Sequence, residues 1–275
     1  MTDFPQIQPI DASPEIAKVF TDIRFVSGLA VVNLIWRHFA ALPGVIDWAW
    51  PAVRPIIASQ QMIAARQRLM ESIDLPLLEP VTLDAWRSIG LSDPDLADFR
   101  ELITNYVRGN CTNLIALTAL RLRLEGAEGS SPVFIPADPP PIAASLPPLP
   151  RIDYLEPELA HAIQALAKRH EGAQSGIVPS LYLELARWPI LIKYFPLWLA
   201  PLYAPLTIQA TREATYHVAQ TEAMAMLPTL PTSLDNMQAM RPALDQFTRL
   251  IIPDLIPVCL AVQRLLPDTV GNSDG

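Results

Sequence analysis

Hydrophobic positions recur every three or four residues along most of the chain, which is the spacing of an amphipathic helix. The clearest start is at Ser13, a preferred N-cap residue, with Pro14 at the first helical position. An apolar stripe follows, made of Ile16, Val19, Phe20 and Ile23. The same pattern predicts helices over residues 84–89, 93–108 and 114–124, the last one stopped near Gly126. Because strand signals are scarce, we predict an all-α fold.

One helical unit occurs twice in the sequence, at an offset of 146 residues. Residues 31–43 resemble residues 177–189, and at the same offset Arg66 falls on Arg212. A fixed offset of this kind is the signature of an internal repeat. We therefore predict two tandem helical repeats that pack together as a pseudo-dimer, with a cleft at the seam.

Prolines mark the expected boundary between the repeats. They are dense between Pro132 and Pro150, where they favour an extended, semi-rigid connector. We predict a first repeat over residues 1–131, a Pro-rich linker over residues 132–152, a second repeat over residues 153–267 and a frayed tail over residues 268–275. A ligand for an SH3-type domain is the alternative interpretation of the Pro-rich segment, but its place between the repeats already accounts for it.

Composition narrows the class of protein. Hydrophobic residues make up 51% of the 275 residues, which excludes disorder for most of the chain. The net charge of −8 argues against nucleic-acid binding, which needs clustered Lys and Arg. The N-terminus has no basic and apolar leader, so a cytoplasmic protein is expected.

The apolar segment over residues 189–208 has the length of a membrane span. Four prolines interrupt it, and each proline inside a regular helix costs about 3 kcal/mol. We expect short, kinked helices here, buried with the matching segment over residues 43–57, and keep a membrane role as the lesser alternative.

Familiar catalytic and metal-binding motifs give little guidance. The four histidines lack HExxH spacing and a neighbouring cysteine ligand, so no metal is expected. Cys111 and Cys259 lie in apolar helical context without a CxxC pattern, which favours small buried apolar residues. A disulfide between them is the alternative.

Two segments can carry chemistry. Gly109-Asn110 opens an apolar stretch, where the Asn110 amide could hold a water or a carboxylate. Ser180 begins the repeated helix, whose start presents free N–H groups suited to a carboxylate. The simpler interpretation of Asn110, Thr112 and Ser180 is helix capping.

These segments resemble the group I 2-haloacid dehalogenases, a cofactor-free family of D-specific and non-stereospecific enzymes. The resemblance covers most of the chain. It includes Asp22-Ile23-Arg24, residues 40–44 followed by Trp48-Ala49-Trp50, Gly109-Asn110 with residues 118–120, and Ser180 with residues 185–189. It implies an all-α fold of two related repeats joined by a long linker, no cofactor, and association of two chains.

The resemblance also implies site residues. In the family an asparagine and an aspartate activate a water that attacks the halogen-bearing carbon directly. The asparagine matches Asn110, and the serine that holds the substrate carboxylate matches Ser180. The aspartate directly follows that serine in the family, whereas this chain has Leu181. Val31 and Leu34 stand where the family has pocket aromatics.

Glu184 is the candidate replacement for the missing base. It follows Leu181 by three residues, on roughly the same helix face, and at the repeat offset it falls on His38. If the repeats pack about a two-fold axis, Glu184 and His38 could meet in the cleft as an acid–base pair. The alternative is that Glu184 pairs with Arg187 or meets solvent, and that His38 is a satisfied polar residue.

Three functions follow from these observations. The first is a hydrolase of small 2-substituted carboxylic acids, 2-haloacid dehalogenase-like, in which a water attacks directly. The second is a relative without dehalogenase activity that binds a small apolar carboxylic acid in the cleft between the repeats. The third, a structural or membrane-associated helical protein, rests only on the apolar segment over residues 189–208.

Overall fold

The computed structural model describes residues 4–129, 131–141, 146–172, 176–231 and 237–267. Within these residues the regular structure is helical and no strand occurs, so the prediction of an all-α fold is confirmed. The first half of the chain forms α1 (Pro14–Ser27), α2 (Leu34–Ala41), α3 (Val45–Ile57), α4 (Gln60–Glu71), α5 (Leu83–Ser88) and α6 (Asp93–Leu124). The second forms α7 (Pro157–Ala167), α8 (Ser180–Glu184), α9 (Pro189–Trp198), α10 (Ala200–Tyr203), α11 (Pro205–Met224), α12 (Met237–Gln246) and α13 (Ile252–Leu265). The described residues also contain the short 3-10 helices η1 (Pro9–Asp11), η2 (Ile152–Tyr154) and η4 (Leu185–Arg187), and a π-helical turn, η5 (Phe247–Ile251).

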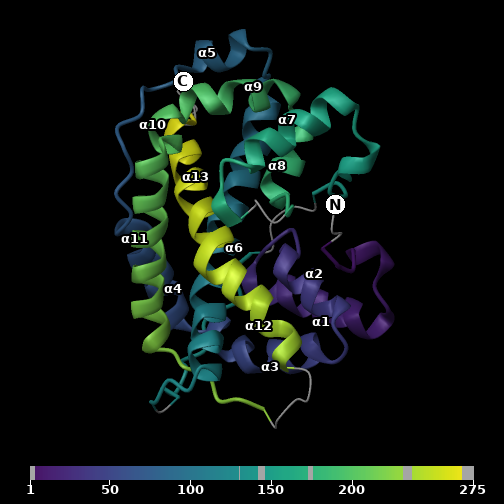
Figure 1. The fold of residues 1–275 in the computed structure, drawn as a ribbon, viewed down its shortest axis with the longest axis vertical. Helices are drawn as coiled ribbons and strands as arrows, with labels where there is room; N and C mark the ends of the chain where they lie inside the picture. The colour runs from purple at the N-terminus through teal and green to yellow at the C-terminus, as the bar shows by residue number, and fades with distance from the viewer. Residues whose placement is uncertain (1–3, 130, 142–145, 173–175, 232–236, 268–275) are drawn as a thin grey trace, which may run out of the picture.

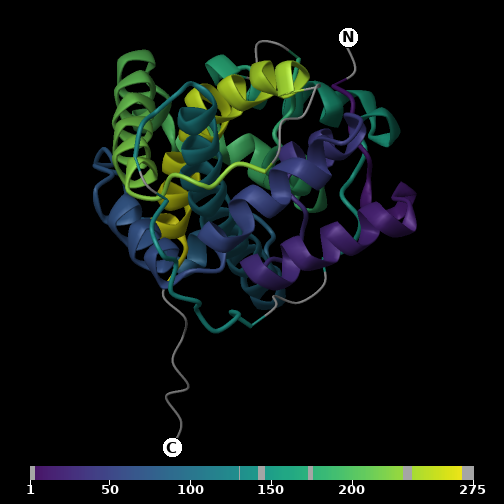
Figure 2. The same ribbon diagram turned by 90° about the horizontal axis from the view of Figure 1, so that it is seen from below.

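Three long helices form the centre of the molecule. Helices α6, α11 and α13 pack against one another along their lengths, and Figure 1 shows α11 and α13 running side by side with α6 behind them. Helices α1 to α3 lie towards one end of this group, and α7 to α9 lie towards the other (Figure 1). Figure 2 shows the molecule from below, along its longest axis. The two outer groups of helices meet beside the middle of α6, where Arg37 of α2 contacts Ser180 of α8.

Helix α6 corrects one sequence prediction. We expected separate helices over residues 93–108 and 114–124, but the structure has one helix of 32 residues. Gly109 lies inside this helix, where its missing side chain makes room for a neighbour: a Cβ there would lie 3.1 Å from Cδ1 of Leu29. Asn110 and Thr112 are therefore mid-helix residues, and their interpretation as N-caps is wrong.

The predicted start of the first helix is confirmed. The Ser13 side chain accepts a hydrogen bond from the Ile16 N–H at 3.3 Å, and Pro14 takes the first helical position. The helix ends at Gly28, whose φ of +64° suits glycine. A Cβ at Gly28 would also lie only 2.5 Å from Pro140 Cγ, so glycine lets the Pro-rich connector lie close to α1.

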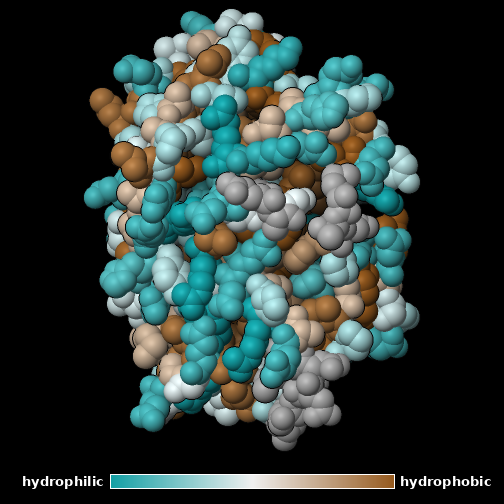
Figure 3. Space-filling view, viewed as in Figure 1, coloured by the Kyte–Doolittle hydropathy of each residue, from teal (hydrophilic) through white to brown (hydrophobic). Residues whose placement is uncertain are grey.

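The proline-rich apolar segments form short helices, as expected, but the expectation that the two segments are buried together is wrong. Helix α3 packs on α1, α2, α4 and α6, whereas α9 and α10 pack on α7, η4 and α11. Residues 189–208 cover α9, α10 and the start of α11, with Ala204 between the last two. The matching segment of the first half is the single helix α3, which retains Pro51 and Pro55. In the part of the chain that the structure describes, no helix is both long and apolar enough to cross a bilayer. On the face drawn in Figure 3, hydrophilic side chains predominate and apolar ones are scattered among them.

The order of helices is similar in the two halves. At the offset of 146 residues, α2 overlaps α8 with η4, α4 overlaps α11, and α6 overlaps α12 to α13. The internal repeat and the domain limits at residues 131 and 153 stay predictions. The tail predicted over residues 268–275 lies outside the described residues.

Candidate active site

A cavity of about 490 Å³ lies where the two halves of the chain meet. The beginning of α2, the middle of α6, helix α8 and the region from η5 into α13 line it, together with residues 8–11 and 146–151. Its polar lining residues include Asn33, Arg37, Tyr106, Asn110, Asn113, Ser180 and Glu184. Hence Asn110 and Ser180, from segments far apart in the sequence, face the same space.

Helix α6 presents three polar side chains to this cavity. Tyr106, Asn110 and Asn113 are spaced four and three residues apart, which places them on one face of the helix. The Nε1 of Trp36 donates to Oδ1 of Asn113 at 2.9 Å and fixes that amide. The Nδ2 of Asn110 has only a long contact, 3.9 Å, to Sγ of Cys259. Asn110 can therefore exchange a weak contact for a hydrogen bond to a bound water or ligand.

Ser180 is held by a buried arginine. The Nη2 of Arg37 donates to Oγ of Ser180 at 3.0 Å, so the serine hydroxyl is not a helix cap and that interpretation is wrong. Burial lowers the pKa of Arg37, but a guanidinium stays protonated in proteins. Within the described residues, the buried Nε of Arg37 and Oδ1 of Asn33 have no hydrogen-bond partner. The guanidinium of Arg37, with an unused N–H donor at a cavity wall, suits an anionic ligand, whereas Oδ1 of Asn33 can only accept a hydrogen bond.

Glu184 lies one turn after Ser180 and lines the same cavity. Its carboxylate contacts Nη1 of Arg187 at 2.7 Å, as the alternative interpretation expected, and the residue is only 1% exposed. Burial raises the pKa of Glu184 to about 7, against the opposing effect of the positive charges of Arg187 and Arg37. A buried carboxyl group that titrates near neutral pH is suited to accept a proton.

Among the other predicted site residues, Val31 and Leu34 line the cavity, but Leu181 and His38 do not. Leu181 is fully buried in the apolar core. It follows Ser180 by one residue, which turns its side chain about 100° around the helix. On α8, the side chains of Ser180 and Glu184 point to the cavity. We expected Leu181 and Glu184 to share that face, and this prediction is wrong for Leu181.

His38 interacts with the N-terminal segment instead. Its Nδ1 lies 2.7 Å from the carbonyl oxygen of Pro5, and its ring stacks on Phe4 at 4.0 Å. Burial lowers the pKa of His38, which favours a neutral ring. The structure therefore does not bring His38 to Glu184, because it is Arg37, the preceding residue on α2, that faces the cavity.

Sequence reasoning missed Arg37 and Tyr106. Arg37 is a charged residue inside the apolar run Leu34–Phe39, and this alone could have indicated a buried, functional guanidinium. Tyr106 precedes Asn110 by four residues and so shares its helix face. Burial raises the pKa of Tyr106 well above its usual range, so its hydroxyl stays protonated and can donate a hydrogen bond.

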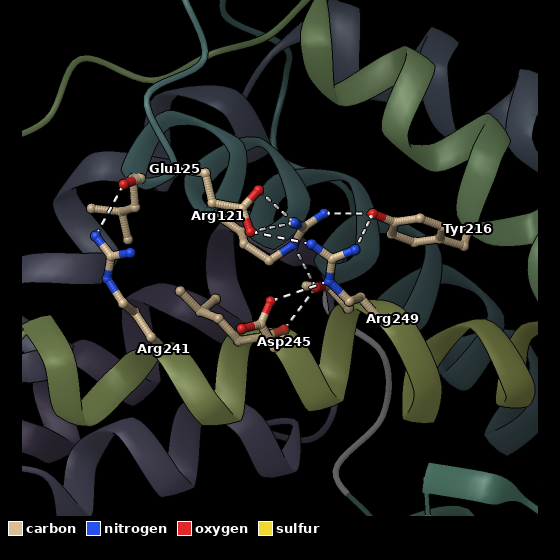
Figure 4. Close-up of polar contacts among 9 residues, drawn as sticks. Arg121, Glu125, Tyr216, Arg241, Asp245 and Arg249 are labelled. Atoms are coloured by element: carbon tan, nitrogen blue, oxygen red, sulfur yellow. Dashed lines mark hydrogen bonds and ion pairs between the residues drawn. The ribbon is translucent and has the colours of Figure 1, made fainter.

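The apolar wall of the cavity includes a π-helical turn. Phe247 and Ile251 belong to η5, and both line the cavity. Behind them, Nε of Arg121 donates to Oγ1 of Thr248 at 3.0 Å. Figure 4 shows that Arg121 also binds Glu125 and Tyr216, and that Arg249 joins the same cluster. Helix α6 thus fixes the turn that shapes this wall.

Comparison with known proteins identifies relatives of one kind. No family model matches the chain. A configuration-inverting 2-haloacid dehalogenase of Alcaligenes xylosoxydans xylosoxydans is 27% identical over 247 residues, which are 84% of this chain and 78% of the relative.

Solved structures agree in fold. A D-2-haloacid dehalogenase mutant in complex with D-2-CPA has a TM-score of 0.73 and 21% identity, over 95% of this chain and 94% of the other. A D-2-haloacid dehalogenase with L-LA has a TM-score of 0.69 and 20% identity, over 95% and 92% of the two chains. The resemblance to 2-haloacid dehalogenases that the sequence suggested is thus confirmed in fold and in sequence.

Proposed function

We propose that this chain, which shares its fold with D-2-haloacid dehalogenases and its sequence pattern with a configuration-inverting relative, hydrolyses small 2-substituted carboxylic acids, including 2-haloacids. One observation supports this most strongly. A cationic anchor, an amide and a carboxyl group that titrates near neutral pH all line the same cavity, with apolar residues between them.

The anchor is formed by Arg37 and Ser180. The substrate carboxylate binds the guanidinium of Arg37 and the hydroxyl of Ser180, which already contact each other at 3.0 Å. The apolar substituent on C2 then lies against the apolar part of the lining, which includes Val31, Leu34, Phe247, Ile251, Ile252 and Leu255.

The remaining polar residues act on water. Asn110 orients a water, and Glu184 takes its proton as the oxygen attacks C2. The new C–O bond forms as the carbon–halogen bond breaks, and the halide leaves with the bonding electron pair. Attack opposite the leaving group inverts the configuration at C2. Leu181, which stands where the family has its aspartate, takes no part because its side chain lies in the core.

Halide release from the two enantiomers of 2-chloropropionate tests this proposal. We expect release with the wild type, and a loss of roughly 10²- to 10⁴-fold in Asn110→Ala and in Glu184→Gln. Asn105→Ala is the matched control, because Asn105 is a buried asparagine of the same helix that does not line the cavity. Absence of halide with either enantiomer at high enzyme concentration would reject the hydrolase.

A binding protein for a small apolar acid is the second candidate. The replacement of the family's aspartate by the core residue Leu181 favours it, since an anchored acid could then stay unreacted. A medium-chain carboxylate at a hundred times its Kd would stabilise the fold by about 2.7 kcal/mol. Thermal stabilisation by such an acid without halide release would identify this function. Cytoplasmic location and the pairing of two chains remain part of the proposal.

A further inference from the structure

A second cavity, of about 250 Å³, lies under the Pro-rich connector, against α1, α3, α4 and α6. The connector is fixed there by backbone hydrogen bonds, from Gln60 to Ile135 and from Ala137 to Ala58, both 2.9 Å long. The lining is mostly apolar and includes Phe25, Met62 and Ile63. The cavity is therefore a defined pocket with an ordered wall on the connector side.

Two arginines beside this pocket lack an acidic partner. Arg66, which lines the pocket, donates from Nη1 to Oγ1 of Thr112 at 3.4 Å, and Arg108 donates to the carbonyl oxygen of Gly28 at 3.3 Å. Among the residues that the structure describes, no carboxylate lies within 4.0 Å of either guanidinium. The acidic residue of the lining, Asp138, is exposed and beyond that distance.

The other arginine of the lining, Arg54, already has an acidic partner. Arg54 is neutralised by Asp22, with contacts of 2.6 and 2.9 Å. Burial lowers the pKa of Arg66, and the positive charge of Arg108 lowers it further, which shows that the two guanidinium groups repel each other. A bound anion would relieve this repulsion.

The matching place in the second half contains its own carboxylates. At the offset of 146 residues Arg66 falls on Arg212, whose guanidinium contacts Glu171 at 2.6 Å and Asp254 at 3.6 Å. At the same offset, Glu171 falls on Phe25 and Asp254 falls on Arg108. The first half thus keeps the arginine but replaces both acids, one by an aromatic ring and the other by a second cation.

We propose that this pocket binds the carboxylate of a small organic acid at Arg66 and Arg108, with the apolar tail of the acid packed on Phe25, Met62 and Ile63. The bound carboxylate takes the place that Glu171 and Asp254 occupy beside Arg212. The apolar lining selects an acid with a hydrocarbon tail over an inorganic anion, and the volume restricts it to a small molecule. This site is separate from the 490 Å³ cavity and shares no lining residue with it.

The methyl group of Met62 reports on this pocket directly. In protein labelled with [methyl-¹³C]methionine, hexanoate should shift the Met62 signal, which a Met62→Leu variant assigns. Hexan-1-ol, with the same tail and no charge, should leave the signal unchanged at equal concentration. The exposed Met224 provides an internal control.

Two variants test the charge requirement. Arg66→Met should weaken hexanoate binding by about tenfold or more, since it removes a charge-assisted pair. Phe25→Glu restores an acid beside Arg66, so it should block binding and raise the melting temperature. An equal response to hexan-1-ol, or unchanged hexanoate binding in both variants, would overturn the proposal. The presence or absence of halide release tests only the function proposed for the larger cavity. The Met62 signal tests only this pocket, because it does not depend on catalysis.

Discussion

Glu184 is a buried carboxyl group held between positive charges at the wall of a cavity. Burial favours its neutral form, whereas Arg187 at 2.7 Å and the nearby Arg37 favour the anion. The resulting pKa of about 7 means that both protonation states are populated near neutral pH. A general base is most effective when its pKa lies near the working pH, so this balance suits the proposed role.

The proposed role fixes the pH dependence of the reaction. Only the deprotonated form of Glu184 can accept a proton, so the rate of halide release should rise as pH passes through about 7 and level off above it. Arg187→Met removes the largest of the charges that lower this pKa and should move the rise to higher pH. A rate profile whose midpoint is the same in wild type and Arg187→Met would exclude Glu184 as the titrating group.

Single residues show what the sequence could and could not predict about the site. Asn110 and Ser180 were placed by family resemblance and Glu184 by helix spacing, and all three line the cavity. His38 was misplaced and Arg37 was missed, although they are neighbours. One step along a helix turns a side chain by about 100°, and the sequence period alone does not fix which face meets the cavity. Contacts made by the N-terminal segment, which decide this for His38, are not visible in a local pattern.

At the scale of the elements, the π-helical turn η5 is the least regular part of the cavity wall. Such turns occur often at functional sites, where they change the direction of side chains within a helix. Here α12 continues through η5 into α13, and Phe247 and Ile251 of the turn line the cavity. The sequence predicted neither this turn nor the continuous helix α6, because both depend on packing between distant segments.

Arg121 of α6 should fix the shape of this turn. Arg121→Met removes its bonds to Thr248, Glu125 and Tyr216, which we expect to lower the free energy of unfolding by about 1–3 kcal/mol. It should also raise the KM for the haloacid, because Phe247 and Ile251 lose their fixed position. Urea unfolding and steady-state halide release measure the two effects.

Arg123→Met is the matched control for this prediction. Arg123 lies on the same helix but, among the described residues, bonds only to the backbone carbonyls of Pro228 and Ala127, away from the turn. It should cost stability without changing KM. Equal KM values for both variants would show that Arg121 stabilises the fold but does not position the cavity wall.

At the scale of the whole molecule, the sequence predicted the fold class because proline and glycine punctuation and helical periodicity are local signals. The packing of the connector against α3 and α4 was not predictable, since it depends on backbone hydrogen bonds between residues about 75 positions apart, such as Gln60 to Ile135. The same holds for the polar cluster that joins the helices of the second half.

That cluster contains two buried groups with opposite pKa shifts. His170 contacts the hydroxyl of Tyr182 and lies 3.8 Å from the carboxylate of Asp254, which in turn faces Arg212. Burial lowers the pKa of His170 to about 3 and raises the pKa of Asp254 to about 7. The folded state therefore binds fewer protons than the unfolded state at His170 and more at Asp254.

These opposite shifts should offset each other in the dependence of stability on pH. The stability associated with protonated Asp254 is complete below about pH 4 and is lost as pH rises through about 7. The destabilisation that comes from keeping His170 neutral in the folded state disappears as pH rises towards 6.5. Asp254→Asn leaves the histidine effect alone, so between about pH 4 and 6.5 the free energy of unfolding should rise with pH more steeply than in the wild type, by up to about 1.4 kcal/mol per pH unit. His170→Gln should change the slope in the opposite direction. Urea titrations over this pH range measure how the free energy of unfolding changes with pH in each protein. Such a slope arises only where the folded and unfolded states bind different numbers of protons. Identical slopes in the three proteins would therefore show that neither group changes its pKa on folding.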